Sequence, residues 1–381
     1  MGERDLDYNK CDNPANTVLQ DIIDDPVLRQ YNTRIIAEPW SAGGNYGIKT
    51  GAFPAASGAA GAAGVGWDEW HGYFRAWWRA FMTDDTWALN RREGPADGGF
   101  TMTGSFDLFG WNGRRPYHSV NFVSVHDGFP MYDLFSYNAK QNLCGPLNPV
   151  CCTQPLSPFC DRDSGENNNR SRDCGQANED VKRQLMRNLF VAMMISHGTP
   201  LLLGGDEWIR TQLGNNNAYS SGADNEYNWF DWGSWQTYDE KHRMHDFVRS
   251  LLRLRKAKAY AWAPDAYGAG APFAWKSEAN TEPPDWTSHH LMVHYYDANQ
   301  GPELCILINL ERTNVSFTLP SGRAWVRLVD TQAYFDRPEY FTMTGAPTRE
   351  SANIDLSGTT PVPGAVYDVP GSTLVILEAQ P

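Results

Sequence analysis

The chain has 381 residues, enough for two or more domains, and its formal net charge is −13. So acidic a chain argues against nucleic acid or an anionic membrane surface as a partner, and it fits a neutral substrate. The sequence contains no run of about 18 apolar residues, so we expect no membrane-spanning helix. The first eight residues also lack the basic and apolar regions of a signal peptide.

The first two thirds of the chain alternates helix-like and strand-like patterns, which indicates an α/β fold. Residues 15–31 have helical spacing that Pro26 kinks or ends. Three short apolar runs predict buried strands that end on polar or ionisable side chains, at 34–38, 119–127 and 199–207. Because a helix precedes the first strand, we expect the chain to begin partway through a β/α alternation.

Between these strands the sequence predicts one flexible loop and several helices. The loop is the run 55–64, which contains only Ala, Gly and Ser. Residues 67–79 predict an aromatic strand that leads into a helix. Long amphipathic helices are expected at 180–197 and 239–256, and the second carries Lys and Arg in its last turns, as the helix dipole favours.

The pattern changes after residue 262. Helical periodicity ends, and short alternating apolar runs follow one another between Pro, Gly and Asp turns. These runs are 289–296, 304–310, 315–319, 325–329 and 372–377. They predict an antiparallel β-sandwich. We therefore expect an α/β domain at 1–261 and a β-sandwich domain at 262–381.

Five of the seven cysteines lie in one segment rich in Pro, Asn, Ser and Asp, which predicts a long loop. They are Cys144, Cys151, Cys152, Cys160 and Cys174. A zinc site is not expected, because no His lies among them and two of them are adjacent. Disulfides in this loop would suit a periplasmic or secreted protein, whereas a set of free thiols is the alternative.

Glu38 is the first candidate for catalysis. It ends the strand 34–38 and is followed directly by Pro39 and Trp40. A carboxylate at the C-terminal end of a parallel strand occupies the position at which barrel enzymes keep catalytic residues. An aromatic, partly dry site would raise its pKa toward that of a general acid for glycoside hydrolysis. The alternative is a solvated glutamate at a strand end.

His126 and Asp127 end the strand 119–127 and are the second candidates. They could hold a pair of substrate hydroxyls and stabilise the positive charge that develops on the sugar. The alternative is a structural His–Asp hydrogen-bonded pair. Asp206 and Glu207 end the strand 199–207, but the two glycines before them favour a structural role in a tight turn.

Sugar rings stack on flat aromatic faces, and the chain has 15 Trp and 17 Tyr. Most of these side chains are expected in the core. The expected substrate-binding residues are those in loops near the candidate carboxylates: Trp40, Tyr46, Trp70, His71, Asn215 and Tyr219. The Asn-rich segment 215–219 could line a sugar site or merely cap turns. Dinucleotide, P-loop and serine-hydrolase motifs are absent from the sequence, so no cofactor or metal is expected.

Five stretches, taken together and in chain order, resemble the bacterial isoamylase group of the α-amylase superfamily. They are 36–40, 67–75, 120–128, 198–207 and 215–219. Members of this group are glycogen and starch debranching enzymes. The resemblance implies a (β/α)8 barrel followed by a β-sandwich, with this chain supplying the second half of the barrel.

The resemblance also implies residue roles. It makes Glu38 the general acid/base at the end of the fifth barrel strand. It makes Asp127 the transition-state stabiliser and His126 a ligand of substrate hydroxyls at the end of the seventh. The implied reaction is hydrolysis of α-1,6 branch linkages in glycogen or amylopectin, with retention at the anomeric carbon.

The sequence departs from the family upstream of Glu38. The family carries its nucleophilic aspartate on the fourth barrel strand, and neither that motif nor the first-strand His and Asp motif is present. We therefore expect a truncated form that lacks the nucleophile, with the missing half of the barrel as a partner. Other functions stay open: a non-catalytic α-glucan-binding or interaction protein, or an amylase-type enzyme acting on α-1,4 bonds.

Overall fold

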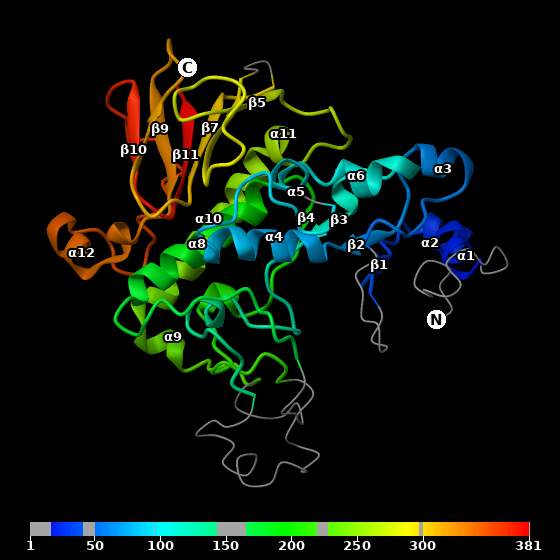
Figure 1. Cartoon of the computed structure of the whole chain (residues 1–381), viewed down its shortest axis with the longest axis horizontal. Helices are drawn as coiled ribbons and strands as arrows, with labels where there is room; N and C mark the ends of the chain where they lie inside the picture. Colours follow the sequence, from blue (N-terminus) through cyan, green and yellow to red (C-terminus); the bar gives the residue numbers. More distant parts are fainter. Residues whose placement is uncertain are drawn as a thin grey trace, which may run out of the picture.

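The computed structural model describes residues 17–40, 50–95, 97–142, 165–218, 228–296 and 300–380. Parallel strands lie near the centre of the molecule, and the antiparallel strands of the last third form a separate layer beyond the long helices (Figure 1). In the described part of the chain, no helix is long and apolar enough to cross a membrane.

The central sheet has four parallel strands whose spatial order follows the chain. They are β1 (Ile36–Ala37), β2 (Asp68–Trp70), β3 (Ser119–Asn121) and β4 (Thr199–Pro200). Ile36 pairs with Asp68, Glu69 with Ser119, and Val120 with Thr199. All C-terminal strand ends therefore lie on one edge of the sheet, followed by the candidate residues.

The strands occur where the sequence predicts them, but they are shorter than expected. Beyond β3 the carbonyl of Val123 accepts a hydrogen bond from the side chain of Arg79 at 2.6 Å, instead of pairing with a neighbouring strand. In β4, Pro200 has no N–H to donate to the sheet. Beyond the C-terminal end of β3, a side-chain hydrogen bond therefore replaces the backbone bonds between strands, and the loops of the site begin there.

The predicted helix at 15–31 is two helices, α1 (Val18–Asp24) and α2 (Pro26–Gln30), which meet at Asp25. The Asp25 carboxylate accepts from the backbone N–H groups of Val27 and Leu28 at 2.8 and 2.9 Å, so it caps α2. The prediction that Pro26 ends the first helix is confirmed.

The prediction of a flexible loop at 55–64 is wrong, because α3 (Gly58–Ala62) forms there. Its C-terminal end is closed by two backbone bonds, from Gly64 to Gly61 at 2.9 Å and from Val65 to Ala60 at 3.0 Å. Gly64 has a φ of +90°, the left-handed conformation that this closure requires. Alanine has the highest helix propensity, and the glycine supplies the end signal.

The predicted helix after the aromatic strand is α4 (Gly72–Thr83), and the two long predicted helices are α8 (Glu179–Ile195) and α10 (Asp239–Ala257). Short helices occupy the connections: α5 (Gly98–Met102), α6 (Phe106–Phe109), α9 (Ser234–Thr237) and α11 (Ala259–Trp262). Single 3-10 turns lie at η1 (Gly110–Asn112), η2 (Pro116–His118), η3 (Asp133–Phe135), η4 (Asp206–Trp208) and η5 (Ala333–Asp336).

The last third of the chain forms two antiparallel sheets, as the alternating pattern predicts. The larger has the order β5-β6-β7-β11-β9 and the smaller pairs β10 with β8. The strands are β5 (Phe273–Lys276), β6 (His290–Tyr295), β7 (Leu304–Asn309), β8 (Val315–Thr318), β9 (Trp325–Asp330), β10 (Val366–Val369) and β11 (Thr373–Ala379). Phe317 of β8 packs with Leu307 of β7 in a buried cluster between the sheets.

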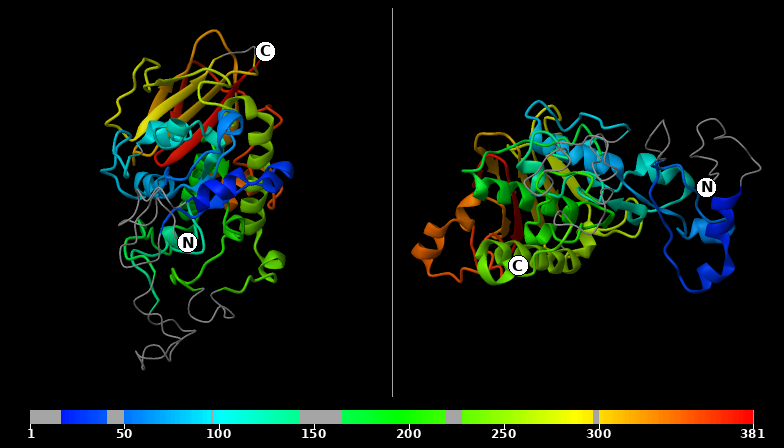
Figure 2. Two further views of the ribbon diagram at one scale, coloured as in Figure 1. Left: turned by 90° about the vertical axis from the view of Figure 1, so that its right-hand side faces the viewer. Right: turned by 90° about the horizontal axis from the view of Figure 1, so that it is seen from below.

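The helix α12 (Pro338–Thr344) projects from the β-strand part, and α1 and α2 lie at the other end of the molecule (Figure 2). One buried cluster joins the helices to the large sheet: Phe190 of α8, Phe247 of α10 and Ile306 of β7 all belong to it. The two parts of the chain therefore share a continuous core.

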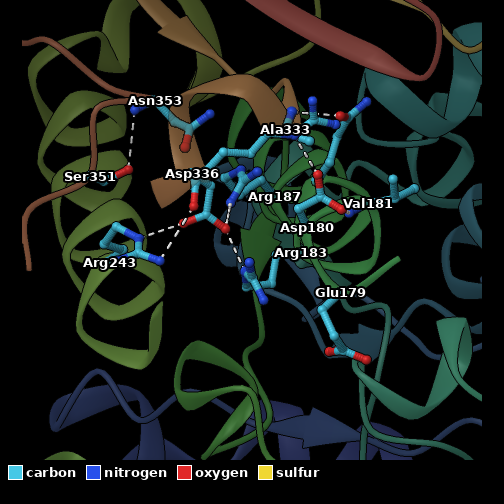
Figure 3. Close-up of polar contacts among 12 residues, drawn as sticks. Glu179, Asp180, Val181, Arg183, Arg187, Arg243, Ala333, Asp336, Ser351 and Asn353 are labelled. Atoms are coloured by element: carbon cyan, nitrogen blue, oxygen red, sulfur yellow. Dashed lines mark hydrogen bonds and ion pairs between the residues drawn. The ribbon is translucent and has the colours of Figure 1, made fainter. Parts of the chain in front are cut away.

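A buried ion cluster strengthens this junction (Figure 3). The Asp336 carboxylate of η5 forms ion pairs with Arg183 and Arg187 of α8 and with Arg243 of α10. The Asp336 side chain is 1% exposed, and the three positive charges hold the pKa of its carboxyl below the ordinary value despite its burial. Three guanidinium groups on one carboxylate tie the β-strand part to both long helices.

Candidate functional site

The strand ends that carry the candidate residues are joined by aromatic rings. Trp40, after β1, lies 6.1 Å from Trp70 of β2, measured between ring centroids. Trp70 lies 5.5 Å from Phe122 and 6.0 Å from His126, both after β3. We call Trp40, Trp70, Phe122 and His126 the aromatic row: Trp70 lies between Trp40 and His126, and Phe122 packs beside both tryptophans, 6.5 Å from Trp40. It brings three sequence-predicted site residues together along the C-terminal edge of the sheet.

Glu38 stands beside one end of the aromatic row. Its side chain is exposed, and its backbone carbonyl accepts from the N–H of Trp40 at 2.9 Å. This tight turn follows β1 directly, so Glu38 and Trp40 leave the sheet at the same point. The partly dry setting that the sequence predicts for this carboxylate is therefore not formed by the described residues.

Asp127 and His126 stand at the other end of the row. His126 is exposed and Asp127 is half-buried. Arg75 of α4 donates to the backbone carbonyl of Asp127 at 3.3 Å and to the Glu166 carboxylate at 3.0 Å. Its guanidinium also lies 5.8 Å from the centre of the Phe122 ring. Arg75 therefore supports the Asp127 loop and the aromatic row together.

Arg79, one turn further along α4, is completely enclosed and holds the same loop by its backbone. Besides Val123, it donates to the carbonyls of Phe129 and Asn169, both at 3.3 Å. Burial lowers the pKa of its guanidinium to about 9, and the positive charge of Arg75 acts in the same direction. It stays charged at neutral pH, because that value lies above 7. Val123 and Phe129 bracket Asp127, so this side chain fixes both flanks of the loop.

Asp206 of η4 holds the loop from the β4 side. Its carboxylate accepts from the Ser124 hydroxyl and from the backbone N–H of Met131 at 2.9 Å. Burial raises the pKa of Asp206 to about 7, although both hydrogen bonds oppose the rise. The structural role that the sequence favours for Asp206 agrees with these contacts. Glu207 accepts from the backbone N–H of Gly205 at 2.9 Å, a contact within the turn.

The Asn-rich segment also meets the Asp127 loop. Gly128 has a φ of +96°, and its N–H donates to the carbonyl of Asn216 at 2.9 Å. The Asn216 side chain is buried and donates to the Glu166 carbonyl at 2.7 Å and to the Asn169 amide oxygen at 2.9 Å. The Asn215 side chain is buried as well and accepts from the N–H of Asn217 at 2.9 Å. Asn215 thus shapes a turn, the alternative that the sequence left open.

His71 does not lie where a substrate-binding residue is expected. It is fully buried: Nδ1 accepts from the backbone N–H of Phe74 at 2.6 Å, and Nε2 lies 2.9 Å from the Ser105 hydroxyl. Burial lowers the pKa of His71 to about 3, so the ring is neutral at pH 7. It caps the N-terminus of α4, and its placement contradicts the prediction of direct substrate contact.

The two carboxylates of β2 are engaged in structural ion pairs. Asp68 receives two hydrogen bonds from Arg34, at 2.8 and 2.6 Å. Glu69 is fully buried, pairs with Arg114 and accepts from the N–H of Gly51 at 2.7 Å. Neither carboxylate is available to react with a sugar.

Some predicted features lie outside the described residues. These are Tyr46, Tyr219 and four of the loop cysteines, Cys144, Cys151, Cys152 and Cys160. Cys174 is half-buried with a free thiol. In the described part of the chain, no three His, Cys, Asp or Glu side chains are grouped closely enough to hold a metal ion.

Curated proteins of known activity align with most of the chain. An isoamylase from Flavobacterium sp. is 29% identical over 368 residues, which cover 90% of this chain. The chloroplastic isoamylase SU1 of Zea mays is 31% identical over 348 residues, which cover 88% of it. The chain is related to the isoamylases of the α-amylase superfamily. These alignments span 42% and 39% of the two relatives, so the chain covers about two fifths of their length. No protein-family model matches the chain.

Solved structures of pullulanases share the fold of this isoamylase relative. A pullulanase from Bacillus acidopullulyticus superposes with a TM-score of 0.55 at 15% identity, over 94% of this chain and 36% of its own. A pullulanase from Anoxybacillus sp. LM18-11, complexed with maltotetraose, gives a TM-score of 0.54 at 15% identity, over 94% of this chain and 42% of its own. At this identity the likeness concerns the fold alone.

Sequence reasoning missed three residues that hold the loops, Arg75, Arg79 and Glu166, whereas Asn216 lies in the Asn-rich segment that the sequence singled out. One signal was available. Arg75 and Arg79 are four residues apart on an otherwise aromatic helix, so they share one helix face. A buried arginine needs acceptors, and backbone carbonyls of a neighbouring loop are the usual source when carboxylates are absent. The sequence does not show which loop supplies these carbonyls, because only the fold brings residues 123–129 next to this helix face.

Proposed function

We propose that this chain carries the general acid/base half of an isoamylase-type glycoside hydrolase that cleaves α-1,6 branch linkages in glycogen- or starch-type glucans. The single observation that carries the proposal is the C-terminal edge of the parallel sheet. There an exposed glutamate and a half-buried aspartate stand at the two ends of an aromatic row. The isoamylase relatives supply the reaction class.

The same proposal makes the four parallel strands the second half of a (β/α)8 barrel. A closed barrel needs eight such strands, and its catalytic residues follow the C-terminal strand ends. Apolar side chains on the outer strands support this idea: Ile36 of β1 is 53% exposed, and 201–203, after β4, are half-exposed. Further strands would cover these side chains and remove the open edges.

In this mechanism Glu38 protonates the glycosidic oxygen of the branch and then activates the water that releases the sugar. Asp127 stabilises the oxocarbenium-like transition state through its negative charge, and His126 binds substrate hydroxyls. Trp40 and Trp70 offer ring faces to the glucose units on either side of the branch. Arg75 and Arg79 position Asp127 through its backbone and take no part in the bond changes.

A retaining reaction also needs a nucleophilic carboxylate about 5 Å from the acid. The β2 carboxylates are committed to Arg34 and Arg114, and the chain spans about two fifths of its relatives. We therefore propose that the nucleophile belongs to polypeptide beyond these 381 residues.

The test is reducing-sugar release from glycogen, with iodine staining in parallel. We expect no release from the purified 381-residue chain. We expect release with a rise in iodine colour once the chain is joined to a barrel half that carries the nucleophile. Release by the 381-residue chain alone would overturn the assignment of the nucleophile to another segment. An inactive joined protein would overturn the proposed reaction.

A second candidate function is glucan binding without hydrolysis. The observation that favours it is that the aromatic row is formed within this chain, whereas the proposed nucleophile is assigned to polypeptide beyond it. Retention on a glycogen column, together with an inactive joined protein, would support this function over debranching.

A further inference from the structure

A groove lies at the junction between the α/β part and the large antiparallel sheet. Its first hollow, of about 430 Å³, is lined by the rings of Phe100, Trp275 and Trp286 and by the polar side chains of Asn90, Asp97 and Thr103. A second hollow of about 390 Å³ continues from Thr103 along 267–273. The rings of Phe273 and Trp275, 5.3 Å apart, join the two hollows. We call the pair of hollows the junction groove.

The walls of the junction groove are held by backbone bonds between the two parts of the chain. The N–H of Asn90 donates to the carbonyl of Trp286 at 2.9 Å, and that of Leu89 donates to Ser288 at 3.2 Å. On the opposite wall Asp97 caps α5 through the N–H of Phe100 at 3.1 Å. The groove is therefore a preformed feature that binding does not have to create.

Two half-buried tryptophans form its aromatic wall. Trp275 lies on β5, the outer strand of the large sheet, and its ring centroid is 5.7 Å from that of Trp286 at an interplanar angle of 63°. Both rings are half-exposed and face a space that also contains an amide, a carboxylate and a hydroxyl. Flat apolar faces next to hydrogen-bonding groups suit a sugar ring, whose faces are apolar and whose rim is polar.

The junction groove is remote from the candidate active site. His197, which lines the second hollow, lies two residues before β4, and its N–H donates to the carbonyl of Met102 in α5 at 2.9 Å. The groove therefore borders the N-terminal ends of the parallel strands. Glu38 and Asp127 follow the C-terminal ends, on the opposite edge of the same sheet.

We propose that the junction groove is a second binding site for a linear α-1,4-linked segment of the glucan, separate from the hydrolytic site. The identity of the sugar rests on the proposed function, whereas the presence of a sugar site rests on the groove itself. Two hollows that adjoin at Thr103, with a tryptophan pair lining the first, suit a chain of several glucose units. A second site of this kind would hold one branch of the polymer while the strand-end site engages another.

The groove can be emptied or filled without touching the strand-end site. Trp286→Ala removes one stacking face. Gly99→Leu fills the hollow instead, because a Cβ at Gly99 would meet only Asp97 Oδ1 at 3.4 Å and the Trp286 ring at 4.0 Å. Gly99 lies in α5, where leucine is the better helix former, so this variant is expected to fold. Trp232→Ala is the matched control, since Trp232 is 79% exposed and is not among the residues that line the two hollows or form the aromatic row.

The experiment is native electrophoresis of the 381-residue chain in gels that contain glycogen, with maltohexaose as a soluble competitor. We expect Trp286→Ala and Gly99→Leu each to weaken retardation about tenfold, and Trp232→Ala to leave it unchanged. Trp40→Ala, tested alone and combined with Trp286→Ala, measures how much of the glycogen binding comes from the strand-end site. If both groove variants bind as the unaltered chain does, the groove proposal is overturned. If only the groove variants lose binding, the groove stands and the strand-end site of the proposed function fails.

Discussion

Arg79 and Asp206 hold the loop of the candidate aspartate from opposite sides. Arg79 Nε donates to the carbonyl of Val123 at 2.6 Å, and Asp206 Oδ1 accepts from the N–H of Met131 at 2.9 Å. Asp127 lies midway between these two anchor points in the chain. The loop on both sides of it is therefore fixed by one cation and one carboxyl group that are themselves buried.

Arg79→Lys should lower the stability of the folded chain. A lysine cannot reach three carbonyls in the fork geometry of a guanidinium, so at least two buried acceptors lose their partner. We expect a loss of about 2–4 kcal/mol in the free energy of unfolding, measured with urea. Arg92→Lys is the control, because Arg92 is largely exposed, with a 3.5 Å pair to Asp97 and a 3.0 Å hydrogen bond to the Pro95 carbonyl, both at the surface. An unfolding free energy within about 0.5 kcal/mol of the unaltered chain would show that the loop does not depend on Arg79.

Asp206→Asn should change how stability depends on pH. The pKa of Asp206 is raised from 3.8 to about 7, so between these values the folded chain keeps a proton that the unfolded chain releases. Stability from this group therefore falls as pH rises through that window, by up to about 1.4 kcal/mol per pH unit, and is constant above it. Asparagine does not titrate, so the stability of the variant does not fall with pH through this position. The unaltered chain should lose stability relative to the variant between pH 4 and 7.

Other buried groups titrate near this window, so the difference between the two proteins is the informative quantity. Burial raises the pKa of Asp133 to about 6 and lowers that of His197 to about 4, and these shifts act on stability in opposite directions. Both groups are common to the two proteins. Thermal melts at matched pH values measure the difference, and a pH-independent difference would contradict the shifted pKa of Asp206.

The elements with a strong local signal are those that the sequence predicts well. The aromatic strand before α4, the long helices α8 and α10, and the five runs predicted after residue 262 all form near their predicted positions, whereas β5 and β10 were not predicted. Each is specified by a hydrophobic period that matches its own geometry. The α3 helix was missed because a run of glycine and alanine is compatible with either a loop or a helix. The backbone bonds that close the helix at Gly64, which decide between the two, are visible only in the structure.

The residues of the candidate site also fall into those that a local sequence signal reveals and those that only the fold reveals. Glu38 and Asp127 are recognisable because each follows an apolar strand. Whether a neighbouring polar residue faces substrate depends on what the fold places beside it. His71 shows this dependence: the hydroxyl of Ser105 and the N–H of Phe74 occupy both ring nitrogens. Asn216, which joins Gly128 to Asn169, is indistinguishable in sequence from Asn215, which closes its own turn.

Asp336→Asn should destabilise the junction between the two parts of the chain. Three buried or nearly buried guanidinium groups would lose their counter-charge, and removal of one partner from a buried ion cluster costs about 3–5 kcal/mol. Asp239→Asn is the control, because Asp239 pairs with the exposed Arg349 at the surface and such pairs contribute about 0–1 kcal/mol. Denaturant unfolding followed by tryptophan fluorescence measures both. Equal effects of the two substitutions would show that Asp336 adds no more than a surface pair.

Glu38→Gln tests the acid/base assignment in the joined protein that carries a nucleophile. Glutamine keeps the size of the side chain, but its amide cannot act as an acid toward the glycosidic oxygen, so kcat for glycogen debranching should fall by about 10²–10⁴-fold with little change in KM. The matched control is Glu207→Gln, because an amide oxygen at Glu207 can still accept from the N–H of Gly205. A near-normal rate for Glu38→Gln, or an equal loss for Glu207→Gln, would remove Glu38 from the reaction. A fall confined to Glu38→Gln would instead place the proton donor at the C-terminal end of β1.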